Sequence, residues 1–168
     1  MILDEEVFAV ILAVAVVASV FAAVHVLDLR PSEPFTAIGL LDANCKIGEY
    51  PREALIGSNV TLCIFVDNHM GRPIYYKVVY RIAAPETLPT NTTPSPEPKL
   101  LEWRGVLGNK QNTTFIVHVP VAHPKASANT SRVALVFELW IYDTERNQWI
   151  YTGRWVHLYI KPVAVRTG

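Results

Sequence analysis

Charged residues are missing from one long stretch of the chain. No Asp, Glu, Lys or Arg occurs between Val7 and Leu27, where Ser19 and His25 are the polar interruptions. An apolar run of about 20 residues matches the roughly 30 Å hydrocarbon core of a bilayer. The run predicts one transmembrane helix within residues 1–30. A cleaved secretory signal is the main alternative, but the residues before the run, Asp4 to Glu6, lack the positive charge of such a signal.

Net charge and catalytic motifs are also lacking. Fifteen Lys and Arg balance fifteen Asp and Glu, and this zero net charge argues against nucleic acid as a partner. The sequence contains no Gly-x-Ser-x-Gly, no phosphate-binding Gly-rich loop and no His-Glu-x-x-His. We therefore predict no catalytic residues, no metal site and no cofactor, and we expect a protein that is not an enzyme.

The chain has only two cysteines, Cys45 and Cys63. No Cys-x-x-Cys and no spaced His pair lies near them, which disfavours a metal site. In an oxidising compartment an even pair of cysteines is more often bridged than free. We predict a disulfide between them. The alternative is two small buried apolar residues, because Cys63 alternates with Phe65 on one face of a predicted strand.

After the apolar run, the hydrophobic residues recur with the period of two that is typical of strands. The predicted strands are 35–41, 60–66, 74–82, 100–107, 115–119, 133–141, 148–151 and 155–160. Asp143 to Asn147 predicts a hairpin turn, and the proline-rich segment Pro85 to Pro98 predicts a stiff, exposed loop. Seven or eight short antiparallel strands predict one all-β domain, residues 31–168, with an immunoglobulin-like β-sandwich fold.

Four Asn-x-Ser/Thr acceptors for N-linked glycans lie in this predicted domain. They begin at Asn59, Asn91, Asn112 and Asn129. Because such acceptors belong on secreted surfaces, they favour an extracytoplasmic domain with N-linked glycans. Arg30, just after the apolar run, weakly favours the opposite orientation. For any single acceptor, a polar turn or strand residue is the alternative, and it is the better interpretation for Asn59.

Three further patterns suggest contacts. The aromatic residues Trp140, Tyr142, Trp149, Tyr151 and Trp155 would suit a stacking platform for sugar or protein, although such pairs commonly just stabilise a sheet. His69 lies in a predicted turn, where we expect it to cap nearby backbone. In the helix, Ala15, Ser19 and Ala23 stand four apart, the small-xxx-small pattern that lets transmembrane helices pack closely.

Several short runs resemble an archaeal family of predicted membrane proteins of unknown function. The runs are Phe35 to Ile38, Tyr50-Pro51, Gly57 to Thr61, Val66 to His69 and Tyr75 to Val78. Members of that family pair transmembrane helices with an extracytoplasmic domain, so the resemblance implies the same location and a fold like that of envelope adhesion modules. It covers residues 35–82 and departs in the anchor, where the family has several helices. It implies no activity.

These observations lead to three hypotheses for function. The first is a single-pass membrane-anchored accessory or structural subunit of an archaeal envelope or membrane complex, using its sandwich for protein contacts. The second is a pilin-like filament subunit that assembles with copies of itself, against which stands the lack of a short basic leader. The third is a carbohydrate-binding adhesive module, which needs the aromatic residues to be exposed together. The expected location is the cell membrane, with the C-terminal domain extracytoplasmic.

Overall fold

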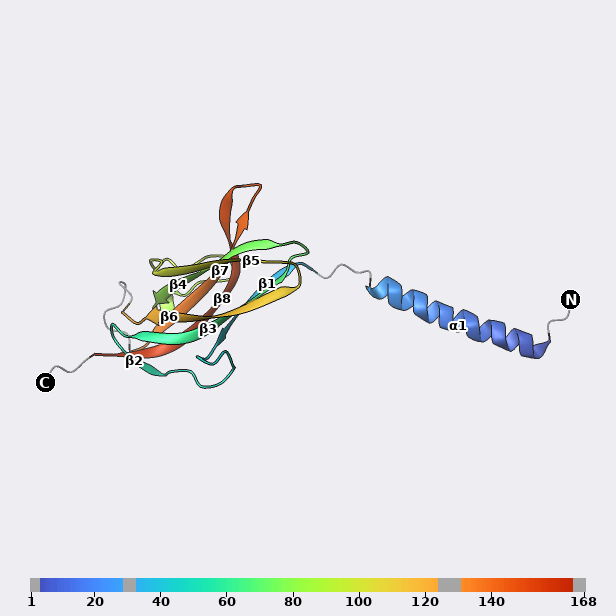
Figure 1. The fold of residues 1–168 in the computed structure, drawn as a ribbon, viewed down its shortest axis with the longest axis horizontal. Coiled ribbons are helices and arrows are strands. Elements are labelled where there is room, and N and C mark those ends of the chain that lie inside the picture. The colour runs from blue at the N-terminus through green and yellow to red at the C-terminus, as the bar shows by residue number, and fades with distance from the viewer. Residues whose placement is uncertain (1–3, 29–32, 124–130, 165–168) are drawn as a thin grey trace. The chain divides into compact units, whose positions relative to one another are not determined.

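The structure, a computed structural model, describes residues 4–28, 33–123 and 131–164. The chain divides into two compact units, Met1–Glu33 and Pro34–Gly168. The first unit contains the apolar helix, and the second contains a β-sandwich (Figure 1).

The N-terminal unit contains the helix α1, Glu5–Asp28. Two acidic residues, Glu5 and Glu6, lie in its first turn, where they complement the helix dipole. Its 24 residues extend about 36 Å at roughly 1.5 Å per residue. The helix is therefore long and apolar enough to span a membrane. The same length and composition also suit a secretory signal.

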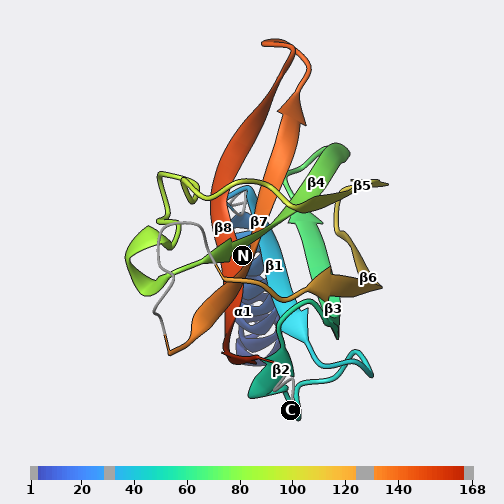
Figure 2. The same cartoon turned by 90° about the vertical axis from the view of Figure 1, so that its left-hand side faces the viewer.

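The described residues of the second unit form eight strands in two sheets (Figure 2). The strands are β1 (Phe35–Leu41), β2 (Glu53–Leu55), β3 (Asn59–His69), β4 (Ile74–Ala83), β5 (Leu101–Leu107), β6 (Gln111–Pro120), β7 (Val133–Asp143) and β8 (Gln148–Val163). One sheet has the order β1-β3-β6, and the other has the order β2-β8-β7-β4-β5. The predicted immunoglobulin-like β-sandwich behind one N-terminal helix is confirmed.

Two details of the strand prediction are wrong. Segments 148–151 and 155–160 belong to one strand, β8, which continues through a register shift opposite Leu139 and Trp140. Gly153 adopts a φ of 73°, a left-handed conformation that suits glycine and lets the strand bend without ending. The short strand β2 is absent from the prediction, and it pairs with β8 in parallel, so the sandwich is not wholly antiparallel.

The core lies between the two sheets and uses alternate residues of each strand. Buried side chains from β3, β4, β6 and β7 meet there; the largest include Leu62, Ile64, Val78, Tyr80, Val117, Leu135 and Phe137. The Tyr80 hydroxyl donates a hydrogen bond to the Pro120 carbonyl oxygen at 2.7 Å. Burial raises the pKa of the Tyr80 phenol. The single buried polar group of this side chain is thus satisfied, as a dry core requires.

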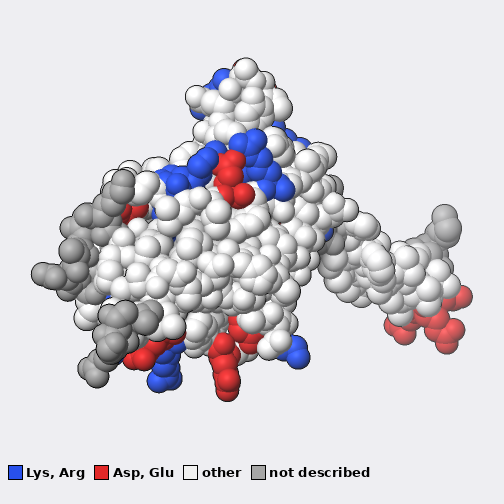
Figure 3. Space-filling view, turned by 60° about the vertical axis from the view of Figure 1, so that its left-hand side comes forward, with Lys and Arg blue, Asp and Glu red and all other residues white. Residues whose placement is uncertain are grey.

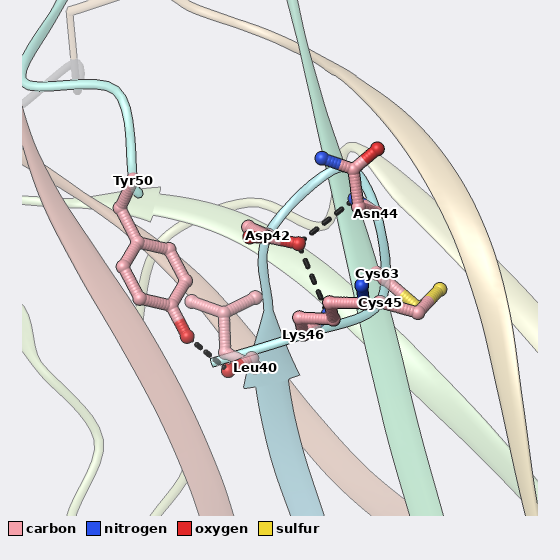
Figure 4. The surroundings of a disulfide bond; sticks show 7 residues. All are labelled: Leu40, Asp42, Asn44, Cys45, Lys46, Tyr50 and Cys63. Carbon is pink, nitrogen blue, oxygen red and sulfur yellow. Dashed lines mark hydrogen bonds between the residues drawn. A yellow bond between two sulfur atoms is a disulfide. The ribbon is translucent and has the colours of Figure 1, made fainter. Parts of the chain in front are cut away.

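A disulfide between Cys45 and Cys63 joins the β1–β2 loop to β3, with their Cα atoms 5.2 Å apart (Figure 4). The loop forms a tight turn around Asp42. The carboxylate oxygen Oδ1 of Asp42 accepts hydrogen bonds from the backbone nitrogens of Asn44 at 2.8 Å and Lys46 at 3.0 Å. The cross-link therefore holds a turn that is already shaped by local hydrogen bonds.

Replacing both cysteines with serine is expected to lower the free energy of unfolding by about 3 kcal/mol. The two residues are 18 apart in sequence, and opening a loop of this size restores entropy to the unfolded chain. Urea unfolding of the full chain in mild detergent measures the loss. Reduction of the wild-type chain should produce the same loss, and an unchanged midpoint in both samples would contradict the prediction.

Candidate interaction surfaces

The outward face of the five-stranded sheet carries aromatic and charged side chains from three strands. They are Tyr75, Lys77 and Arg81 of β4, Glu138, Trp140 and Tyr142 of β7, and Trp149, Tyr151 and Trp155 of β8. Strand register brings them together, because Lys77 pairs with Trp140, and Trp140 pairs with Tyr151. Cross-strand pairs on one face lie within contact distance, so these residues form one continuous surface.

At the centre of this face lies the fully buried carboxylate of Glu138. Its oxygen Oε2 accepts hydrogen bonds from Arg81 Nε at 3.1 Å and from Trp140 Nε1 at 3.2 Å. Its other oxygen, Oε1, accepts a hydrogen bond from the backbone nitrogen of Ser95 at 2.7 Å. The Arg81 guanidinium also donates to the carbonyl oxygen of Glu97. A buried ion pair thus fastens the β4–β5 loop to the sheet.

The prediction that the whole loop from Pro85 to Pro98 is exposed is therefore wrong for part of the loop. The loop starts with a short 3-10 helix, Pro85–Thr87, but Ser95 and Glu97 are 4% and 5% exposed. The Tyr151 hydroxyl donates to the Thr90 carbonyl oxygen at 2.7 Å, and burial raises the pKa of this phenol to about 12. The buried charge of Glu138 requires donors, and the loop backbone supplies one.

Five residues near the β7–β8 hairpin form what we call the aromatic-basic surface: Tyr75, Lys77, Arg104, Tyr142 and Trp149. The ring centroid of Trp149 lies 5.0 Å from that of Tyr75 and 5.2 Å from that of Tyr142. Lys77 Nζ lies 4.6 Å and the Arg104 guanidinium carbon 5.4 Å from the same centroid. These are packing and cation–π distances. The rings contact one another and two cations, which disfavours an open platform for stacking a sugar.

Positive charge predominates beside these rings. Glu102 Oε2 lies 2.7 Å from Lys99 Nζ and 4.0 Å from Lys77 Nζ, and Oε1 accepts hydrogen bonds from Arg104. The hydrogen bond from Lys99 is the main reason that the pKa of Glu102 is lowered, whereas burial lowers the pKa of Lys77. Three cations surround one carboxylate, a net charge of 3 − 1 = +2. Figure 3 shows basic side chains gathered around acidic side-chain atoms below the projecting hairpin.

A second surface lies along β5, which we call the β5 edge. Among the described strands, β5 pairs only with β4, so its other side carries unpaired backbone groups. Its apolar side chains are exposed: Leu101 is 37% exposed and Val106 is 71% exposed. Ile116 on β6, at the edge of the other sheet, is 54% exposed. Unpaired strand backbone with exposed apolar residues is typical of protein contact sites.

The described glycosylation candidates lie on the surface. Asn59 is the first residue of β3, Asn91 lies in the β4–β5 loop and Asn112 lies in β6, and all three are exposed. Asn129 lies outside the described residues. Exposure makes the three asparagines accessible to a modifying enzyme, and their glycosylation stays a prediction.

The expected turn-capping role of His69 is wrong. His69 is the last residue of β3; its Nε2 lies 3.1 Å from Asp67 Oδ2, and its ring stacks on Phe35 with centroids 4.7 Å apart. The neighbouring Asn68 organises the turn instead. Its fully buried side-chain amide donates to three carbonyl oxygens, those of Arg72, Leu107 and Gly108. Asparagine is a stronger turn signal than histidine, and that signal could have identified Asn68.

The helix-packing candidates Ala15, Ser19 and Ala23 are exposed along α1. The Ser19 hydroxyl donates to the Ala15 carbonyl oxygen at 2.7 Å, a bond within the helix. Their role in helix packing stays a prediction. Within residues 4–28, 33–123 and 131–164, no group of three His, Cys, Asp or Glu side chains is placed to hold a metal ion.

Comparison with known proteins finds similarity in structure and none in sequence. No family model and no curated protein matches the chain. The CARDB domain of a Pyrococcus furiosus protein, in complex with di-metal ions, has a TM-score of 0.45 and 11% identity over 79% of this chain and 90% of that one. An ASH/PapD-like domain of human CEP192 has a TM-score of 0.37 and 6% identity over 77% of this chain and 87% of that one. Neither similarity identifies a family, so the resemblance to archaeal membrane proteins stays a prediction.

Proposed function

We propose that this chain is a non-enzymatic, single-pass membrane protein and an accessory or structural subunit of an archaeal envelope or membrane complex. In this proposal α1 is the anchor, the sandwich is extracytoplasmic, and the β5 edge binds a partner protein. The observation that carries the proposal is the exposed apolar strand edge, where Val106 is 71% exposed.

Edge strands of soluble proteins are normally protected by charge, proline or a bulge. On β5 the two charged side chains, Glu102 and Arg104, hydrogen-bond to each other and leave Leu101 and Val106 exposed. A partner that covers these side chains gains roughly 25 cal/mol for each Å² of apolar area buried. A partner strand would also pair with the free backbone of β5. The burial of apolar area and the pairing of backbone groups both favour a protein partner over a small polar ligand.

Three features support the proposed location. The helix α1 has the length and composition of a membrane span. The Cys45–Cys63 disulfide suits an oxidising compartment. The exposed acceptor asparagines Asn91 and Asn112 suit a surface that meets glycosylating enzymes. The helix supports the anchor, and the disulfide and the acceptor asparagines support the outer side of the membrane for the sandwich.

Replacing Val106 with lysine is expected to reduce partner recovery at least about tenfold when the chain is extracted from native membranes in mild detergent. A charge at the centre of an apolar contact costs more than the roughly 1.4 kcal/mol that a tenfold change requires. Quantitative mass spectrometry of the co-purified proteins measures the recovery. Ile47, an apolar residue 88% exposed in the β1–β2 loop, supplies the matched control Ile47→Lys.

The wild-type chain and the Ile47→Lys variant should both recover unrelated membrane subunits in stoichiometric amounts. Recovery of the wild-type chain alone, or only with copies of itself, would contradict the proposal and favour a filament subunit or a free-standing adhesive module. Equal recovery by all three chains would exclude the β5 edge as the contact.

A further inference from the structure

The strand register places the aromatic-basic surface at the end of the sandwich where β1 begins. Phe35, the first residue of β1, pairs with His69 at the end of β3, and β4 starts after the turn 70–73. Tyr75 therefore lies at this end. Next to it, Tyr76 pairs with Ile141, and Tyr142 pairs with Trp149 at the start of the hairpin. All three aromatic rings of the surface thus belong to the end at which the chain enters the domain.

Few residues separate this end of the domain from the proposed anchor. Only residues 29–34 lie between Asp28, the last residue of α1, and Phe35. Whatever conformation they adopt, seven Cα-to-Cα steps reach at most roughly 25 Å. If α1 spans the membrane, the start of β1 is tethered within that distance of the membrane surface. The end of the sandwich that carries the aromatic-basic surface is then within reach of the lipid headgroups.

The side chains of the surface match the chemistry of a headgroup layer. Tyr and Trp are enriched at membrane interfaces, because one part of each ring system is apolar and the other is polar. Basic side chains are attracted to anionic phospholipids. The side chains of Arg104 and Lys99 are 50% and 49% exposed, whereas that of the neighbouring carboxylate, Glu102, is 18% exposed. The charge that this surface shows to its surroundings is therefore positive.

We propose that the aromatic-basic surface binds the headgroup layer of the same membrane that anchors α1, with a preference for anionic phospholipids. The inference rests on the proposed function, because it requires α1 to be in the membrane. It adds a second contact between the chain and the bilayer. That contact would fix the tilt of the sandwich and leave the β5 edge at a defined orientation toward a partner.

The test uses the full chain reconstituted into vesicles of phosphatidylcholine with phosphatidylglycerol, containing a lipid with a nitroxide quencher at headgroup level. Tryptophan fluorescence is compared between the wild-type chain and the Trp149→Phe variant, so that the difference reports Trp149. Trp103→Phe supplies the control, because the ring of Trp103 packs inside the sandwich against Phe115 and Phe137. Flotation of the vesicles is measured on the same samples.

We expect the quencher to remove at least about half of the Trp149 fluorescence and little of the Trp103 fluorescence. Quenching of Trp149 should be weaker in phosphatidylcholine alone and in the Arg104→Gln variant. A chain that floats with the vesicles but shows equal quenching of Trp149 and Trp103 would overturn the inference and leave the anchor intact. A chain that does not float would overturn the proposed anchor and the inference with it.

Discussion

Replacing Glu138 with alanine is expected to lower the free energy of unfolding by about 3–5 kcal/mol, the largest effect of any single substitution considered for this chain. The carboxylate is fully buried and accepts hydrogen bonds from Arg81, Trp140 and the Ser95 backbone. Its removal leaves the guanidinium of Arg81, whose side chain is 15% exposed, without its buried counterion. Urea unfolding of the full chain in detergent, followed by tryptophan fluorescence, measures the loss.

A double substitution separates the cost of an unpaired charge from the value of the pair. In the Arg81→Met, Glu138→Leu variant both charges are replaced by apolar side chains of similar size, a change that is often neutral in other proteins. We expect this double variant to be more stable than Glu138→Ala alone. If Glu138→Ala lowered the free energy of unfolding by less than about 1 kcal/mol, the prediction would be contradicted, because a loss that small is typical of an exposed ion pair.

Replacing Asn68 with alanine is expected to lower the free energy of unfolding by about 3 kcal/mol, because the substitution removes the side chain that connects two turns. The amide nitrogen donates at 2.9–3.1 Å to the carbonyl oxygens of Arg72, Leu107 and Gly108. The amide oxygen accepts from the Met70 backbone nitrogen at 3.0 Å. Of these bonds, the one to the Leu107 carbonyl is fully buried, and an unsatisfied buried carbonyl costs about 1–3 kcal/mol.

Asn109 offers a matched control at the same end of the sandwich. Its side-chain oxygen accepts one exposed hydrogen bond from the Gly71 backbone nitrogen at 2.9 Å. Water can replace an exposed bond of this kind, so Asn109→Ala should cost about 0.5 kcal/mol or less. Urea unfolding of both variants measures the two losses of unfolding free energy. Equal losses for Asn68→Ala and Asn109→Ala would show that the burial of Asn68 does not cause its contribution to stability.

The fold could be predicted from sequence wherever a strand turns one face to the core. Val60, Leu62, Ile64 and Val66 recur at every second position of β3, and all four are buried on its core face. The three residues of β2 are too few to show a period, and their pairing with β8 is set by distant parts of the chain. Strand order is likewise a property of the whole fold, so the exposed edge of β5 could not be anticipated.

The candidate surfaces were harder to predict, because their partners are far apart in sequence. The aromatic residues Trp140, Tyr142 and Trp149 are evident as a cluster in the sequence, but Lys77 and Arg104 join them only through strand pairing. The proline-rich loop suggested exposure from composition alone. One local signal points the other way: Glu138 is a single carboxylate within an apolar strand, and a charge in such a position requires a buried partner.

The intact mass of the chain extracted from native membranes tests the membrane-anchored account most directly. We predict that the extracted protein retains the helix α1 and that glycans on asparagines such as Asn91 and Asn112 add to its mass. Peptides covering Val7 to Leu27 should be present in the membrane fraction. A shorter chain that begins after the apolar run, or recovery of the protein in the soluble fraction, would contradict the anchor and the function that depends on it.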